Sequence, residues 1–366
     1  MGEDPVSLKR LGWNSYFVVL WQGREQEEWL PARVVSQQRG LWRVAGDFAE
    51  CWAEASGTLR AGAQAGGDWP AVGDWVAAEK LSGGGRPLIH KVLPRRSKFV
   101  RKVAGRRLEE QVIAANVDTA FVVMALDGDF NVRRLERYLA QCFESGAKSI
   151  VVLNKSDDCG DVAARVAEVE SIAAGVPIFA VSARTGDGLD ALDDFLAPGQ
   201  TIVLLGSSGV GKSTLVNHFL QRDAQAVQAV RGSDSRGRHT TTSRELFALP
   251  GGALLIDTPG LRELQLWDAA EGVEEAFSDI EELAAQCKYG NCGHTTEPGR
   301  AVQAAIAEGR LDQNRLENQR KLEREQEFLR RKVDPEAQKQ EKERVKLLHR
   351  GARQKYDQRR KDGGKK

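Results

Sequence analysis

The first third of the chain alternates short apolar or aromatic stretches with glycine-rich turns. Five such stretches predict strands, at Ala32–Gln38, Leu41–Gly46, Glu50–Ser56, Asp74–Lys80 and Leu88–Leu93. Glycines near 40, 62–68 and 83–85 separate them. Five short strands in about 65 residues are typical of a small barrel, for which an OB-fold is the best known architecture and an SH3-like barrel the alternative.

From Val117 onward the pattern changes to fully apolar runs that alternate with helical segments. The runs predict buried parallel strands at Thr119–Ala125, Ile150–Leu153, Pro177–Val181, Thr201–Leu205 and Ala253–Ile256. Between the first two, an apolar residue recurs at helical spacing from Leu135 to Phe143, and Gly146 would end that helix. Strand, helix, strand at this spacing predicts a doubly wound α/β domain.

The rest of the chain is helical in pattern, with a cysteine cluster, and becomes highly charged from about Asp312. We therefore expect a multidomain protein. Its predicted parts are an N-terminal segment at 1–29, a barrel at 30–108, an α/β domain at 109–268, a small helical Cys/His domain at 269–311 and a charged helical extension at 312–366.

Composition narrows the class of protein. Hydrophobic residues make up 41% of the 366 and charged residues 29%, no apolar run is long enough for a membrane span, and the N-terminus lacks a signal-peptide pattern. Five cysteines are too few for a disulfide scaffold and odd in number. We expect a cytoplasmic protein, with no membrane partner, no DNA partner and a monomeric state.

The net charge of +1 hides a basic C-terminal arm. From Arg330 to Lys366 the chain has 15 lysines and arginines against 6 aspartates and glutamates. This excess predicts an arm that binds a polyanion, and a charged, solvated helix is the alternative. The stretch 94–102, basic with Phe99 inside it, would suit a nucleic-acid surface next to the barrel, and a solvated loop is again the alternative.

A phosphate-binding loop follows the apolar strand that ends at Leu205. The segment Gly206-Ser207-Ser208-Gly209-Val210-Gly211-Lys212-Ser213-Thr214 has the spacing G-x-x-x-x-G-K-[ST] between a strand and a helix. Its glycines let backbone N–H groups surround phosphates, and the helix N-terminus adds positive partial charge. Lys212 would reach the β- and γ-phosphates, and Ser213 would ligate Mg²⁺.

Two further segments complete a nucleotide site. Asp257-Thr-Pro-Gly260 follows a strand, so that Asp257 could hold Mg²⁺ and the Gly260 amide could meet the γ-phosphate. Asn154-Lys155-Ser-Asp157 and Ser182-Ala183 each follow another strand. The Asp157 carboxylate can accept from both guanine N1–H and the exocyclic amine, which adenine cannot offer together. The Asn154 side chain would hold the base-binding loops in place, and the aliphatic part of Lys155 could lie over the face of the purine.

The order of these segments departs from that of an ordinary GTPase. The guanine-contacting segments at 154–157 and 182–183 precede the phosphate loop at 206–214, whereas they ordinarily follow it. The sequence therefore predicts a circularly permuted GTPase.

The arrangement resembles the RsgA (YjeQ) family of permuted GTPases over residues 8–310. The resemblance rests on motifs at Arg10–Trp13, Leu93–Ser97, Gln111–Asp118, Gly237–Thr242 and Glu297–Gly299. It implies an OB-fold, a permuted GTPase domain and a zinc domain. It also implies a role late in assembly of the small ribosomal subunit and its rRNA, with GTP hydrolysis to GDP stimulated by the subunit.

Catalysis needs a group that orients water, and Leu261 occupies the position where Ras-like proteins place a glutamine. His239 is the candidate, both from its place between the phosphate loop and Asp257 and from the resemblance; a surface histidine without a role is the alternative. Among Thr240, Thr241 and Thr242 we favour Thr241 as the residue that closes over Mg²⁺.

A zinc site is predicted at Cys287-Lys-Tyr-Gly-Asn-Cys292-Gly-His294, which has three suitable ligands. The resemblance implies a fourth, a cysteine six residues after the histidine, where this chain has Arg300, which cannot ligate a metal. Glu297, water or a distant thiolate could complete the shell, or the metal could be lost; both outcomes stay open.

These observations predict a GTP hydrolase that binds the small ribosomal subunit and requires Mg²⁺. A nucleotide-gated binding module, in which hydrolysis is incidental, is one alternative. A GTPase with an unrelated partner is another, which the basic stretches disfavour.

Overall fold

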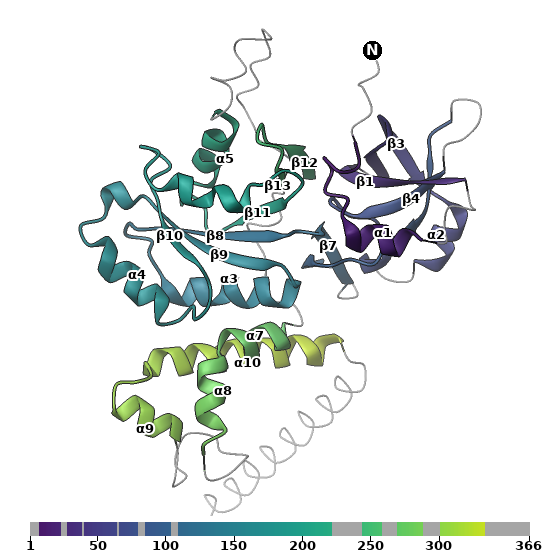
Figure 1. Ribbon diagram of the computed structural model, residues 1–366. Coiled ribbons are helices and arrows are strands. Elements are labelled where there is room, and N and C mark those ends of the chain that lie inside the picture. The colour runs from purple at the N-terminus through teal and green to yellow at the C-terminus, as the bar shows by residue number, and fades with distance from the viewer. Residues whose placement is uncertain are drawn as a thin grey trace, which may run out of the picture.

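The structure is a computed structural model that describes residues 7–22, 28–38, 40–63, 66–79, 85–103, 109–221, 244–257, 269–287 and 301–333. It consists of a β-barrel, an α/β sheet beside it and a group of helices beneath helix α3 of the sheet (Figure 1). No helix of the described ranges is both long and apolar enough to cross a bilayer.

The N-terminal part is a closed barrel of five strands. Helix α1 (Ser15–Trp21) is followed by β1 (Trp29–Gln38), β2 (Leu41–Gly46), β3 (Phe48–Ala55), helix α2 (Gly57–Gly62), the turn η1 (Gly66–Asp68), β4 (Trp75–Glu79) and β5 (Leu88–Val92). The strand order is β1-β2-β3-β5-β4, and β4 pairs with β1 again to close the barrel. Alternate small and branched residues such as Ala32, Val34 and Val44 fill its interior. The five predicted strands are confirmed.

The α/β part is a sheet with helices on both faces. Its parallel strands are β8 (Thr119–Ala125), β9 (Lys148–Asn154), β10 (Ile178–Ala180), β11 (Thr201–Leu205) and β13 (Leu254–Asp257), in the order β10-β9-β8-β11-β13, with antiparallel β12 (Arg244–Ala248) at the end. The connecting elements are α3 (Val132–Ser145), η2 (Ser156–Asp158), α4 (Val162–Glu170), η3 (Leu189–Phe195) and α5 (Lys212–Gln221).

Every residue of β8 is buried because both faces of the sheet are covered. Val122 packs with Leu135 and Leu139 of α3 in one core cluster. Phe121 packs with Leu215 and Phe219 of α5 in the other. The prediction of a doubly wound α/β domain is therefore confirmed.

The barrel strands and the α/β strands belong to one continuous hydrogen-bonded sheet. Strand β12 pairs antiparallel with β1, with Ser36 opposite Glu245 and Gln37 opposite Arg244. The hairpin of β6 (Lys98–Val103) and β7 (Glu109–Ala115) lies between the two parts (Figure 1). We call the β1–β12 pairing and this hairpin the seam.

A buried arginine holds three chain segments near the seam together through hydrogen bonds to their backbone carbonyls. Arg33 is 1% exposed and donates to the carbonyl oxygens of Leu11, Gly73 and Asn116. Burial lowers the pKa of Arg33 to about 10, against the raising effect of Asp118. Its three backbone acceptors come from the N-terminal segment, the barrel and the residues that lead into β8, so one side chain joins all three.

One arginine of the basic stretch 94–102 is held by a buried carboxylate of the protein itself. The Arg95 guanidinium is bound to the fully buried carboxylate of Asp74 at 2.7 and 2.8 Å, and its side chain is 14% exposed. Arg96 pairs with Asp118 and lies over the ring of Phe17. The charge of Arg95 is therefore used within the protein, whereas Arg96 is exposed and pairs with Asp118 at the surface.

The C-terminal helices pack on α3. Helices α7 (Ala270–Ala276), α8 (Ser278–Ala284), α9 (Ala301–Ala307) and α10 (Gln313–Val333) form their own apolar cluster, which includes Ala140 of α3. Gly272 allows α7 to approach α3 closely, since a Cβ there would lie 2.1 Å from the Ala140 carbonyl oxygen.

A buried ionic network reinforces this contact. The carboxylate of Glu136, which is fully buried, accepts hydrogen bonds at 2.5 Å from both Arg315 and Asn318 of α10 and at 2.8 Å from Arg133. Arg315 also binds Asp279 of α8. The helical part is thereby held to the α/β part by fully partnered charges.

Candidate nucleotide-binding site

The loops predicted to bind nucleotide meet at one end of the parallel sheet. The phosphate loop follows β11, the segment 154–157 ends β9, Ser182 and Ala183 follow β10, and Asp257 ends β13. Because the carboxyl ends of parallel strands meet at one edge, segments far apart in the sequence become neighbours there.

Asn154 connects three of these segments. Its side chain is buried, with Nδ2 donating to the Val210 carbonyl at 2.8 Å and Oδ1 accepting from the Ala183 amide at 2.9 Å. Val210 itself is buried in the core. One amide therefore sets the position of the phosphate loop relative to both segments expected to contact the base.

The phosphate loop requires its glycines. Gly206, Gly209 and Gly211 all have positive φ angles. A Cβ at Gly206 would lie 2.2 Å from the Val123 carbonyl oxygen, and one at Gly211 would lie 2.1 Å from Nδ2 of Asn154. Side chains at these positions would therefore disrupt the loop and its contact with Asn154.

The remaining loop residues have contrasting environments. Lys212 begins α5, and its Nζ donates to the carbonyl oxygens of Gly206 at 2.6 Å and Ser207 at 2.5 Å, so the ammonium lies against the first turn of the loop. Ser208, Ser213 and Thr214 are exposed. Ser213 and Thr214 follow Lys212 in the first turn of α5, where backbone N–H groups attract anions.

The segment expected to read the base holds an ionised carboxylate. Ser182 and Arg184 bind Asp157, and the Ser182 hydroxyl is the main reason that the pKa of this carboxyl lies below its usual value. Lys155 has a left-handed backbone, with φ of 66°, and its Nζ pairs with Asp127 at 2.7 Å. That contact places the Lys155 ammonium at the end of β8.

Two residues at the site were not anticipated from the sequence. Arg184 pairs with Asp157 and Asp158, and its position directly after Ser182 and Ala183 is a signal that could have identified it. Arg134 of α3 donates to the Ser207 hydroxyl at 2.8 Å and pairs with Asp129. No local motif marks Arg134, since the contact spans 73 positions.

The described part of the candidate Mg²⁺ site offers oxygen ligands. Asp257 is half-buried at the end of β13, and Ser213 lies at the start of α5. A carboxylate and a hydroxyl are hard donors that suit Mg²⁺. Gly260, His239 and Thr241, together with Leu261, lie outside the described residues.

The predicted zinc site is described only at Cys287, which is half-buried just after α8. Cys292, His294, Glu297 and Arg300 lie outside the described ranges. Within those ranges no group of three metal-binding side chains occurs. The zinc ligand set therefore stays a prediction.

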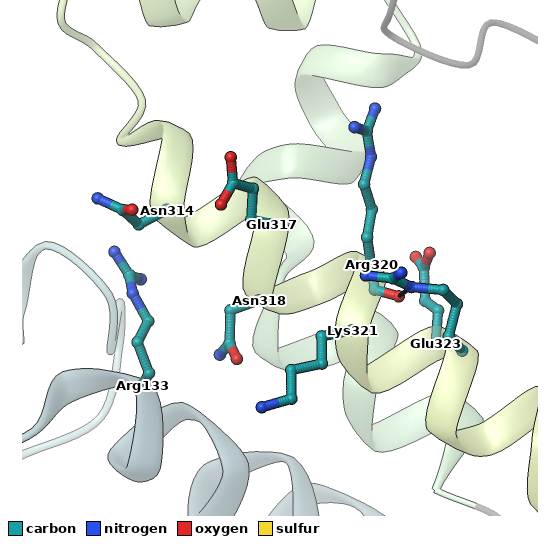
Figure 2. Close-up of a pocket in the computed structure, with 8 residues that line it drawn as sticks. Arg133, Asn314, Glu317, Asn318, Arg320, Lys321 and Glu323 are labelled. Atoms are coloured by element: carbon teal, nitrogen blue, oxygen red, sulfur yellow. Dashed lines mark hydrogen bonds between the residues drawn. The ribbon is translucent and has the colours of Figure 1, made fainter.

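An open groove of about 770 Å³ lies away from these loops, between α10 and the start of α3. Figure 2 shows Arg133 on α3 pointing toward Asn314 of α10, with Asn318 on the same side of that helix. Its remaining lining residues are charged side chains of α10: Glu317, Arg320, Lys321, Glu323 and Arg324. Acidic and basic groups alternate there, so the groove does not resemble the nucleotide site.

Comparison with known proteins agrees with this geometry. Residues 92–267 match the family described as RsgA GTPase, and residues 201–344 match the family described as 50S ribosome-binding GTPase. A protein of Opitutus terrae named small ribosomal subunit biogenesis GTPase RsgA is 46% identical over 357 residues, which cover 95% of this chain and 97% of that protein. A protein of Streptomyces coelicolor with the same name is 44% identical, with 92% and 91% covered.

Solved structures show the same fold. YjeQ from Thermotoga maritima has a TM-score of 0.58 and 25% identity, and the match covers 80% of this chain and 96% of that one. YloQ, described as a circularly permuted GTPase, has a TM-score of 0.57 and 22% identity, with 83% and 97% covered. The permuted order predicted from the sequence is therefore confirmed.

Proposed function

The chain belongs to the RsgA GTPase family and is a GTP-hydrolysing enzyme; on that premise we propose that it acts in maturation of the small ribosomal subunit. The proposal is supported by the names of relatives that match this chain over almost their whole length. The GTP binding that this role requires is supported by the site in which Asn154 joins the phosphate loop to the segments expected to contact the base.

We infer that the Asp157 carboxylate selects guanine. An aspartate is ionised at neutral pH, and Ser182 lowers the pKa of this one further, so both oxygens can accept from the two donors on the Watson–Crick edge of guanine. Adenine presents an acceptor nitrogen where guanine presents its N1–H donor. A carboxylate oxygen of Asp157 would then have no donor and would face another partial negative charge, which makes binding of adenine less favourable. The backbone N–H of Ala183 is held by Asn154, which fixes the second segment against the base.

The phosphate loop and Lys212 would bind the triphosphate. In the structure the Lys212 ammonium is held by two loop carbonyls, so phosphate oxygens would replace these acceptors when GTP binds. Ser213 and Asp257 would hold Mg²⁺, which neutralises charge that develops on the phosphates. Thr241 is proposed to close over the metal, and the Gly260 amide to meet the γ-phosphate.

His239 is the proposed water-orienting residue because Leu261 has no polar group for that task. Hydrolysis stimulated by the subunit would then depend on His239 far more than GTP binding does. Positioning of water contributes roughly 10²–10⁴-fold in rate.

We further propose the partners and the organisation. The barrel is assigned as an OB-fold on its strand order, and together with the basic C-terminal arm it would contact rRNA. The division into parts at 29, 108, 268 and 311 is retained as a proposal. The Cys/His part would bind zinc through Cys287, Cys292 and His294, and the protein would act as a cytoplasmic monomer.

The test is GTP turnover by the full chain with and without purified small subunits. We expect stimulation by subunits, little loss of GTP affinity in His239→Ala, and loss of both affinity and turnover in Lys212→Ala. Turnover that subunits do not change would favour the nucleotide-gated binding module instead. Absence of co-sedimentation with small subunits would contradict the proposed partner.

A further inference from the structure

Two arginines from different parts of the chain share one neutral acceptor at the seam. Arg101 of β6 donates from Nε to Oε1 of Gln111 at 3.0 Å, and Arg244 of β12 donates from Nη2 to the same oxygen at 3.1 Å. Gln111 lies opposite Arg101 in the β6–β7 pairing. The two guanidinium groups must therefore lie close together.

The positive charge of this pair is not compensated by the described residues. Neither Arg101 nor Arg244 forms an ion pair with a carboxylate in the ranges that the structure describes, and their common partner is an uncharged amide. Other arginines nearby do have such partners: Arg43 pairs with Glu50 and Glu245, and Arg95 with Asp74.

Burial makes the uncompensated charge costly. All three side chains are only partly exposed. Burial, and then the charge of Arg101, lower the pKa of Arg244 to about 10, a value at which it is still cationic at neutral pH. Two like charges held at one oxygen repel each other, so an anion that bound both would relieve the repulsion.

We propose that Arg101, Arg244 and Gln111 form a phosphate-binding site separate from the nucleotide loops. Guanidinium groups offer planar pairs of N–H donors that match phosphate oxygens, and the Gln111 amide can add a further donor through its nitrogen. The phosphate could belong to an RNA backbone or to a free phosphate or pyrophosphate ion. The RNA source rests on the proposed function; the free-ion source does not.

Strand β12 links this site to the end of the sheet that carries the nucleotide loops. Arg244 begins β12, and the next residue, Glu245, is paired in register with Asp257, the candidate Mg²⁺ ligand. Arg244 is also opposite Gln37 of the barrel strand β1. A phosphate bound here would contact the strand that joins the barrel to the nucleotide-binding part.

The first arm of the test uses a free ion. Full-length protein saturated with GDP and Mg²⁺ is dialysed against labelled pyrophosphate, so that the nucleotide loops are already filled. We expect one further site in the parent protein and at least a tenfold loss of affinity in the Arg101→Gln/Arg244→Gln double variant. Arg86→Gln is the matched control, because that arginine of the barrel is neutralised by Glu54.

The second arm uses the salt dependence of binding to small subunits. Each phosphate contact contributes roughly 0.7–0.9 to the slope of log affinity against log salt. A slope that falls by about this amount in the double variant, without pyrophosphate binding in the parent, would assign the phosphate to RNA. If subunits do not bind at all, the proposed function fails while the dialysis arm still tests the site.

A third variant separates loss of binding from loss of folding. Gln111→Glu would place a carboxylate between the two arginines, so it should raise the thermal stability and abolish pyrophosphate binding together. The proposal would be overturned if the double variant left both the pyrophosphate affinity and the salt slope unchanged. Arg101 and Arg244 would then only join β6 to β12 through Gln111. Parent-like pyrophosphate binding by Gln111→Glu would overturn it as well.

Discussion

Arg134 donates a hydrogen bond of 2.8 Å to the hydroxyl of Ser207, and this contact ties the first turn of α3 to the phosphate loop. Asp129 holds the same guanidinium with two further hydrogen bonds, of 2.6 and 3.0 Å. Arg133, the preceding residue, instead binds Glu136 and Asp312 beside α10. The start of α3 therefore contacts both the nucleotide site and the C-terminal helices.

Arg134→Ala should weaken GTP binding about fivefold. The variant loses a charged hydrogen bond to the phosphate loop, worth about 1 kcal/mol at a half-exposed position, so the loop should be less well ordered before GTP binds. A fluorescent GTP analogue would measure the change. Arg137→Ala is the matched control because it lies one turn later on α3 and pairs with Glu325 rather than with the loop. Equal affinity of the two variants would contradict the assigned role.

Asp157→Asn should shift base preference from guanine toward xanthine. The amide can accept through one oxygen only and donates through its nitrogen, which suits a base that presents a carbonyl in place of the amine. Competition between GTP and XTP for the protein measures this preference. Asp158→Asn is the control, since Asp158 is the neighbouring, more exposed partner of Arg184. An unchanged preference in Asp157→Asn would exclude this carboxylate as the base-reading group.

Arg315→Ala should destabilise the attachment of the C-terminal helices by about 3–5 kcal/mol. The change leaves the buried carboxylate of Glu136 with Arg133 as its remaining charged partner among the described residues and leaves Asp279 without Arg315, and breaking a buried ion pair by removing one partner is expensive. Chemical denaturation would measure the free energy, and limited proteolysis would detect release of α7 to α10. Combining it with Glu136→Gln should recover part of the loss.

Arg310→Ala provides the reference for that measurement. Its ion pair with Glu308 is exposed on both sides, so its removal should change stability by less than about 1 kcal/mol. Equal effects of Arg310→Ala and Arg315→Ala would show that burial of the Glu136 network contributes no stability.

Deletion of the chain from Asp334 onward should weaken small-subunit binding and reduce its salt dependence, while GTP affinity stays unchanged. The basic excess of the arm motivates this, because each phosphate neutralised by a lysine or arginine releases counterions. A tail of equal length with the basic residues changed to glutamine is the matched control for length. If both shortened and neutral-tail proteins keep the parent salt slope, the arm is a solvated helix.

The sequence by itself determined the barrel strands, the parallel strands of the α/β part and the positions of the loops that follow them. Each rests on local information: glycines whose positive φ angles the phosphate loop needs, apolar runs of strand length, and polar residues directly after them. The order of these segments along the chain also indicated the permutation, which needs no knowledge of distances.

Tertiary structure alone decided how individual charges are used. Arg95 looked like a surface group in the sequence but is bound to the buried carboxylate of Asp74. Arg101 lies in the same basic stretch, yet it shares a neutral acceptor with Arg244. The difference arises because the energy of a charge depends on its burial and on its partners, and those partners come from segments that only folding brings together.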